Sequence, residues 1–92
     1  MGFQVLDVQS TPNPNAAKFV LDRPVSQQPV SFFSAESAQG HPLATALFCV
    51  QGVTSLLLLG DFITVKKSPA VDWKPITREV RKLLADAQSP AE

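Results

Sequence analysis

The sequence predicts an α+β domain: a two-layer sandwich in which a mainly antiparallel sheet of about four strands has two helices on one face. Residues 53–67 contain two apolar runs separated by Gly60-Asp61, a pattern typical of a β-hairpin. Two other stretches have the three- and four-residue apolar spacing of helices. The predicted order of elements, β-β-(β)-α-β-β-α, is typical of such a sandwich.

Length and composition indicate one small domain without a strong charge. The 92 residues include eight basic and eight acidic side chains, so no long-range field attracts nucleic acid or an anionic membrane. The N-terminus lacks a basic and apolar leader, and no apolar run approaches about 18 residues. We expect a monomeric cytoplasmic protein that binds neither nucleic acid nor membrane, with residues 1–88 as the domain and 89–92 as a disordered tail.

Two strands are expected before the hairpin. Residues 3–9 alternate imperfectly, with Leu6 and Val8 on one side, and residues 17–22 alternate clearly. The loop between them contains Pro12 and Pro14, which fix φ and favour extended geometry at the preceding residues. We therefore expect a shaped loop between two strands.

The middle of the chain predicts a short edge strand and an interrupted helix. Residues 30–33 can add the edge strand. Ser34 is an expected N-cap, with Glu36 in the first helical turn, where a carboxylate suits the helix dipole. Pro42 restarts the helix, which continues over residues 43–50 and stops at Gly52.

The hairpin follows, and its first strand is expected to be buried on much of both faces. The last segment is the clearest helix, because Asp72 is a suitable N-cap and Pro75 lies in the first turn, where a missing N–H costs little. Its apolar residues recur at steps of three and four: Trp73, Ile76, Val80, Leu83, Leu84 and Ala87.

Five motifs follow one another over about residues 10–80. They are Thr11-Pro12-Asn13-Pro14-Asn15 followed by Lys18-Phe19; Arg23-Pro24-Val25; Pro42-Leu43-Ala44 with Leu47-Phe48 and Gly52-Val53; Gly60-Asp61-Phe62-Ile63-Thr64-Val65-Lys66; and Asp72-Trp73. Taken together in this order, they resemble the N-terminal domain of the Nfu/NifU family.

The resemblance implies a non-enzymatic accessory domain of iron–sulfur cluster assembly, which recognises a cluster carrier or a client protein. In full-length relatives this domain precedes a C-terminal domain whose Cys-x-x-Cys motif holds the cluster. Cys49 is the only cysteine here, and a cluster needs several thiolates. We therefore expect no cofactor on this chain alone, and an iron–sulfur cluster only through a partner.

Neither catalysis nor a metal site is predicted, because the sequence has no Ser/His/Asp set, no Gly-rich phosphate loop and no cluster of metal ligands. His41 is expected to be a turn or capping residue. Cys49 lies opposite the apolar arc of the first helix, so we expect a partly exposed, inert thiol. The alternative is a metal ligand or redox contact across a subunit interface.

The candidate partner-binding residues lie in the proline-containing loop, in the following strand and on the last helix: Thr11, Asn13, Asn15, Lys18, Arg78 and Lys82. The loop is favoured because two prolines hold polar groups in place at little further ordering cost. A purely structural loop and a solvated helix face are the alternatives. A function of another class, a regulatory module that binds a small ligand, would need a roomy pocket with polar groups beside the hairpin.

Overall fold

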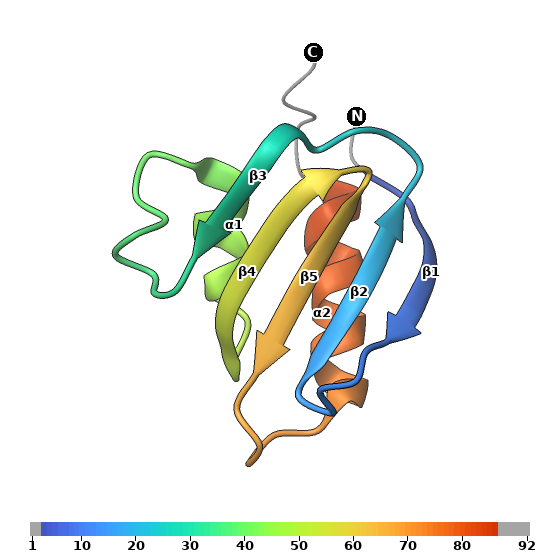
Figure 1. Ribbon diagram of the computed structural model, residues 1–92. Coiled ribbons are helices and arrows are strands. Elements are labelled where there is room, and N and C mark those ends of the chain that lie inside the picture. Colours follow the sequence, from blue (N-terminus) through green and yellow to red (C-terminus); the bar gives the residue numbers. More distant parts are fainter. Residues whose placement is uncertain (1–2, 87–92) are drawn as a thin grey trace.

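The hairpin expected at residues 53–67 lies within the sheet of the computed structural model, which describes residues 3–86 (Figure 1). The strand order is β1-β2-β5-β4-β3, and all neighbouring strands are antiparallel. The expected tail at 89–92 and the apolar position Ala87 lie outside the described residues. The elements are β1 (Val5–Ser10), β2 (Ala16–Leu21), β3 (Ser26–Phe32), α1 (Pro42–Phe48), β4 (Val53–Gly60), β5 (Phe62–Lys67) and α2 (Trp73–Asp86).

The hairpin turn is the two-residue turn that the sequence predicts. Leu59 pairs with Phe62, and Gly60 has a φ of 57°. Among the described residues only glycines have positive φ, so φ of Asp61 is negative. A turn with positive φ at its first central residue, here Gly60, and not at its second is typically of type II′. The glycine therefore supplies the conformation that closes this hairpin.

Within residues 3–86 the sheet has five strands, because the short edge strand expected at residues 30–33 forms and is longer than expected. Residues 26–29, expected as a connection, belong to β3, whose register with β4 shifts between Ser26 and Val30. Pro29 lies within this irregular stretch, and proline is tolerated there because β3 is an edge strand. Phe32, at the end of β3, is buried in the core.

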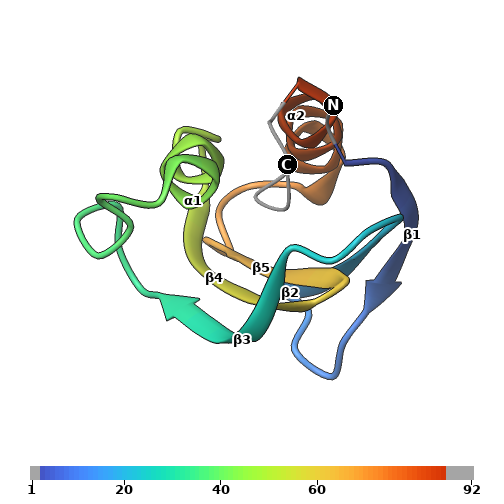
Figure 2. The ribbon, with the colours of Figure 1, turned by 90° about the horizontal axis from the view of Figure 1, so that it is seen from above.

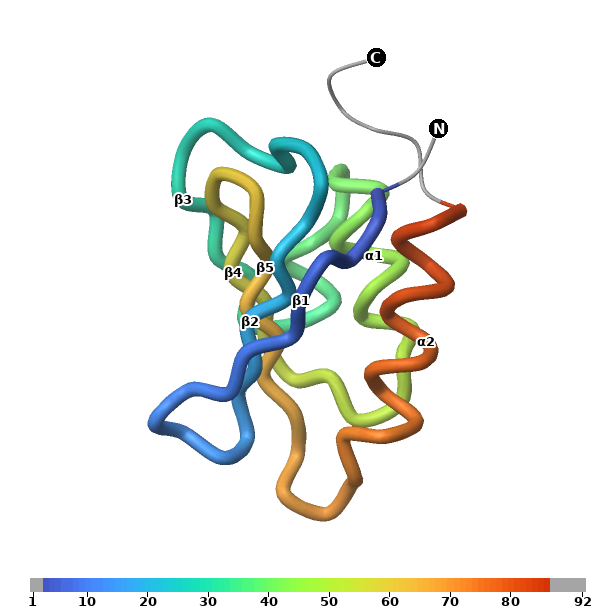
Figure 3. The backbone as a smooth tube through the Cα atoms, turned by 90° about the vertical axis from the view of Figure 1, so that its right-hand side faces the viewer, coloured from blue at the N-terminus to red at the C-terminus, as the bar shows by residue number. Residues whose placement is uncertain are grey.

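Both helices lie on one face of the sheet, as Figures 2 and 3 show, and no helix of residues 3–86 lies over the other face. The inward residues of β2 alternate as predicted, with Phe19 and Leu21 almost fully buried, and β5 alternates in the same way, with Ile63 and Val65 inward. The expected burial of β4 on both faces is wrong. Leu56 and Leu58 are buried, whereas the alternate residues are partly exposed because no layer covers them.

The amphipathic stripe of α2 is confirmed over the described residues. Ile76, Val80 and Leu84 are buried against the sheet, and Trp73 and Leu83 are partly buried beside them. No helix within residues 3–86 is long and apolar enough to cross a membrane. The buried residues of α1 and α2 cover the inner face of the sheet.

Helix α1 begins later than Ser34. His41 is its N-cap, with Nδ1 accepting a hydrogen bond from the Ala44 N–H at 3.2 Å, and Pro42 is the first helical residue. The predicted capping role of His41 is confirmed. The Ser34 hydroxyl accepts from the Ser37 N–H at 3.2 Å, as an N-cap does, but the helix expected from Ser34 is wrong, because residues 34–40 form only turns.

The imperfect alternation of β1 has a structural cause. Its register with β2 shifts between Val5 and Asp7, so Leu6 is the extra residue and its side chain is 60% exposed. Val5 and Val8 both pack against the core. The expectation that Leu6 and Val8 share a face is therefore wrong.

Candidate functional site

The proline-containing loop between β1 and β2 is closed by its own side chains. The Thr11 hydroxyl accepts from the Asn13 N–H at 3.1 Å and lies 2.9 Å and 3.0 Å from the carbonyl oxygens of Asn13 and Ala16. The Asn13 side chain accepts from the Asn15 N–H at 2.9 Å, which forms an Asx-turn. The shaped loop is thus confirmed, with the Thr11 and Asn13 side-chain oxygens engaged within it.

Two residues outside the loop hold it against the end of β5 and the start of α2. Lys67 is only 8% exposed, and its Nζ donates to Asn15 Oδ1 at 3.2 Å and lies 5.6 Å from the centre of the Trp73 ring. Trp73 Nε1 donates to the Pro14 carbonyl at 2.9 Å. The loop therefore has long-range contacts that leave little freedom at Pro14 and Asn15.

Lys67 is not among the candidate residues expected from the sequence, although the pattern of β5 contains a signal for it. Lys67 is two residues beyond Val65 and four beyond Ile63, so it lies on the inward side of β5. An amine at an inward position needs polar partners, and Asn15 supplies one. A recess of about 280 Å³ lies beside this cluster, between the end of β1 and the start of α2, where Trp73 and Thr77 line it.

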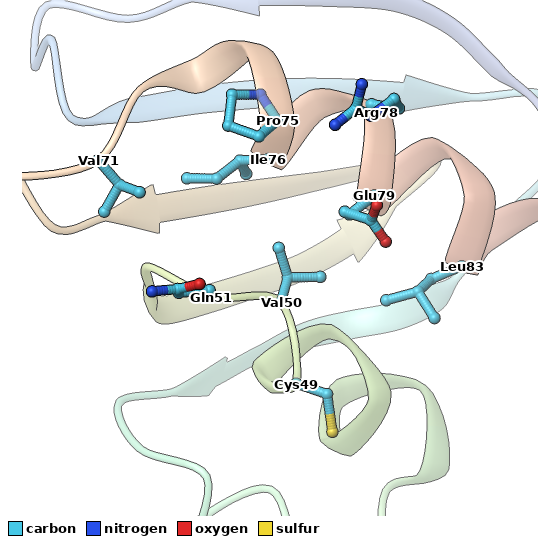
Figure 4. A pocket seen from close by; sticks show the side chains of 9 residues that line it. All are labelled: Cys49, Val50, Gln51, Val71, Pro75, Ile76, Arg78, Glu79 and Leu83. Carbon is cyan, nitrogen blue, oxygen red and sulfur yellow. The ribbon is translucent and has the colours of Figure 1, made fainter.

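A larger groove of about 460 Å³ lies between the end of α1 and the length of α2 (Figure 4). Residues 49–51, which follow α1, line one side. The other side comes from α2 and the segment before it. The lining residues are Cys49, Val50, Gln51, Val71, Pro75, Ile76, Arg78, Glu79 and Leu83. An apolar floor with one cationic and one anionic side chain at its margin suits a polypeptide surface better than a single small apolar molecule.

The candidate residues lie in three separate places. Thr11, Asn13 and Asn15 form the loop at one end of the sheet, and Arg78 lines the groove. Lys18 lies on the face of the sheet that points away from the helices, with Nζ 4.2 Å from the centre of the Phe62 ring. Lys82 is exposed on α2 and does not line the groove. The structure thus does not combine these residues into one site, and their partner-binding role stays a prediction.

Cys49 is exposed at the rim of the groove, as expected from its helical position. In Figure 4 its sulfur atom points away from Val50 and from the α2 side chains. Within residues 3–86 no group of three His, Cys, Asp or Glu residues could hold a metal ion. One thiolate is fewer than an iron–sulfur cluster needs, so Cys49 alone does not provide a cluster site.

Comparisons with known proteins agree on one family. A family model described as "Scaffold protein Nfu/NifU N terminal" matches residues 6–90. "NifU-like protein 5, mitochondrial" of Arabidopsis thaliana is 33% identical over 88 residues, which are 95% of this chain and 32% of that protein. "NFU1 iron-sulfur cluster scaffold homolog, mitochondrial" of Homo sapiens is 34% identical over 86 residues, 91% of this chain and 34% of that protein. The chain thus spans about a third of the length of these relatives.

Solved structures have the same fold. The solution structure of a NifU-like protein from Saccharomyces cerevisiae is 26% identical with a TM-score of 0.79, covering 91% of this chain and 76% of that one. A crystal structure of a Staphylococcus aureus protein has a TM-score of 0.73 at 22% identity, covering 87% of this chain and 96% of that one. The second similarity concerns the fold alone.

Proposed function

This chain belongs to the Nfu/NifU N-terminal family, and from that premise we propose that it is a non-enzymatic accessory domain of iron–sulfur cluster assembly. In this proposal it recognises a protein partner, either a cluster carrier or a client protein. The family membership supports the setting, and the arrangement of the groove supports the recognition role. The two relatives named above are an iron–sulfur cluster scaffold homolog and a NifU-like protein.

The observation that carries the proposal is the groove between α1 and α2. Its apolar lining from Val50, Ile76 and Leu83 can bury a side chain of a partner, and Arg78 at its margin can pair with a carboxylate. The groove opens between the two helices, and its floor residues Val50 and Ile76 are also members of the hydrophobic core.

Cluster chemistry in this proposal belongs to the partner. This chain has one thiol, and that thiol points away from the groove. A partner with a Cys-x-x-Cys motif supplies thiolate ligands, so this domain acts by positioning the partner and not by ligating iron.

The test is an NMR titration of the ¹⁵N-labelled chain with a separately produced Nfu-type Cys-x-x-Cys domain, with its cluster and without it. A second titration uses an apo-form client of that domain. We expect saturable shifts at Val50, Ile76 and Leu83 with at least one of these proteins. Arg78→Glu is expected to raise Kd at least about tenfold, because a charged hydrogen bond contributes about 1.5–3 kcal/mol.

Arg81→Glu is the matched control, because Arg81 is exposed on the same helix and does not line the groove. It should leave Kd within about twofold at physiological salt, because Arg81 lies outside the proposed contact and salt screens an exposed charge there. Equal effects of the two substitutions would overturn the groove as the docking surface. The absence of saturable shifts with both proteins would overturn the proposal itself.

The other functions weighed from the sequence have less support. The side chains of the hairpin that face the helices fill the core, and the groove lies between the helices and not beside the hairpin turn. No observation therefore favours a small-ligand regulator. The cytoplasmic location remains a prediction, and the two relatives have names that say mitochondrial.

A further inference from the structure

The face of the sheet that points away from α1 and α2, here called the outer face, has an apolar centre. Because Ile63 and Val65 point inward, Phe62 and Thr64 point outward. Phe62 pairs with Val20 on β2 and with Leu59 on β4. The next outward row contains Lys18, Thr64 and Leu57.

This centre is unusual for an uncovered antiparallel sheet. The outward residues of such a sheet are normally polar, because water covers that face. Here four neighbouring outward positions on three central strands are apolar: Val20, Leu57, Leu59 and Phe62. All four are partly exposed, and no helix of residues 3–86 covers the outer face of the sheet (Figures 2 and 3). Contiguous apolar surface of this kind typically marks an interaction site.

Cations border the apolar centre on one side. Lys18 lies over the Phe62 ring with Nζ at 4.2 Å, and Lys66 is the next outward residue of β5 after Thr64. Within residues 3–86 neither ammonium group forms an ion pair with a carboxylate. Asp7, which pairs with Val20, bonds through its oxygens to the Val8 N–H at 2.9 Å and to Gln9 Nε2 at 3.1 Å. The bordering cations are thus available to an external carboxylate.

We propose that the outer face binds a protein segment that presents apolar side chains next to carboxylates. The apolar side chains of the segment cover Val20, Leu57, Leu59 and Phe62, and its carboxylates meet Lys18 and Lys66. Charge complementarity selects this occupant, because a second copy of this chain would bring the same cations against the same apolar face. Two lysines around an apolar centre are also fewer cations than an anionic membrane or a nucleic acid favours.

The probes are three designed amphipathic peptides of equal length. The first has leucines on one face and glutamates beside them, the second has lysine in place of glutamate, and the third has serine in place of leucine. We expect the first peptide to shift resonances of Val20, Leu57, Leu59 and Phe62 saturably in the ¹⁵N-labelled full chain. The second should bind at least about tenfold more weakly, because like charges at a contact disfavour binding, and the third should give no saturable shifts.

Variants of the chain locate the contact. Lys18→Glu and Thr64→Glu each place a carboxylate on the outer face at a partly exposed position. Both should lower the affinity for the acidic peptide at least about tenfold. Lys74→Glu is the control, because Lys74 is exposed on α2 in the opposite layer. Neither outer-face variant should change binding to the groove, so this proposal and the proposed function fail separately.

Several outcomes would overturn this inference. They are equal binding of the acidic and basic peptides, shifts confined to the helical surface, or an unchanged affinity of both outer-face variants. Sedimentation that shows a dimer broken by Thr64→Glu would assign the outer face to a second copy instead. Preferential binding of the chain to vesicles with anionic lipid, lost in Lys18→Glu, would assign it to a membrane.

Discussion

Replacing Gly52 with alanine tests how closely the exit of α1 packs against the segment that leads into α2. Gly52 has a φ of 99°, and a methyl group on its Cα would lie 2.6 Å from Cγ2 of Val71. Carbon atoms in proteins do not approach so closely, and optimal contacts are about 3.5–4.0 Å. The Gly52 carbonyl also accepts a hydrogen bond from the Ser68 N–H at 2.8 Å, which limits how far this backbone can move.

The magnitude has two parts. A left-handed conformation costs an alanine about 1–2 kcal/mol, and the smaller entropy of its unfolded chain offsets about 0.4–1 kcal/mol of that. Forcing Val71 aside adds about 1–3 kcal/mol, as overpacking usually does. We expect Gly52→Ala to lower the free energy of unfolding by about 1–5 kcal/mol, a large share of the 5–15 kcal/mol typical of native proteins.

Gly40→Ala is the matched control. Gly40 has a φ of 88°, close to that of Gly52, but a methyl group there meets no atom within 4 Å. Urea unfolding followed by tryptophan fluorescence should therefore separate the two variants by about 1–3 kcal/mol, the overpacking part alone. Adding Val71→Ala to Gly52→Ala should recover part of the loss that the clash causes.

Equal unfolding midpoints of Gly52→Ala and Gly40→Ala, with equal m-values, would refute the close packing of Gly52 on Val71. A double variant that shows simple additivity would refute it as well. Because Val71 lines the groove, Gly52→Ala should also weaken partner binding there, whereas Gly40→Ala should not.

Three further substitutions test single contacts. Trp73→Phe removes the donor to the Pro14 carbonyl and should cost about 0.5–1.5 kcal/mol in urea unfolding, followed here by circular dichroism because Trp73 is the chain's one tryptophan; no change would contradict a role of this bond in holding the loop. His41→Ala removes the acceptor for the Ala44 N–H and should cost about 0.5–2 kcal/mol, while His41→Asn should retain most of the stability; equal losses would contradict the capping role. Cys49→Ser should change the free energy of unfolding by less than about 0.5 kcal/mol, because the thiol is exposed. The substitution should also leave the oligomeric state unchanged; loss of a dimer would instead support a Cys49 contact across a subunit interface.

The periodicity of side chains determined most of the elements. The turn at Gly60-Asp61, the alternation of β2, and the three- and four-residue steps of α2 each predicted the observed structure locally. These signals depend on neighbours within one turn or strand, so they are present in the chain before it folds. The five ordered motifs also placed the chain in its family.

The structure differs from the sequence prediction where the local conformation depends on contacts with other parts of the chain. Ser34 is a good cap in isolation, but the backbone at residues 34–40 forms turns and the helix begins at Pro42. Leu6 fits an alternating strand, but the register with β2 includes a bulge. Both cases show a local preference that the tertiary arrangement overrode.

The sequence by itself determined the fold class, the hairpin, the second helix, the capping residue His41 and the family. Only the tertiary structure decided what the candidate residues do. It separated Lys18 from Arg78 by placing them on opposite layers, it buried Lys67 against Asn15 and Trp73, and it left Leu57 and Phe62 on an uncovered face. The physical reason is that burial and pairing depend on contacts between residues far apart in the chain, and side-chain type and spacing do not specify which face another layer will cover.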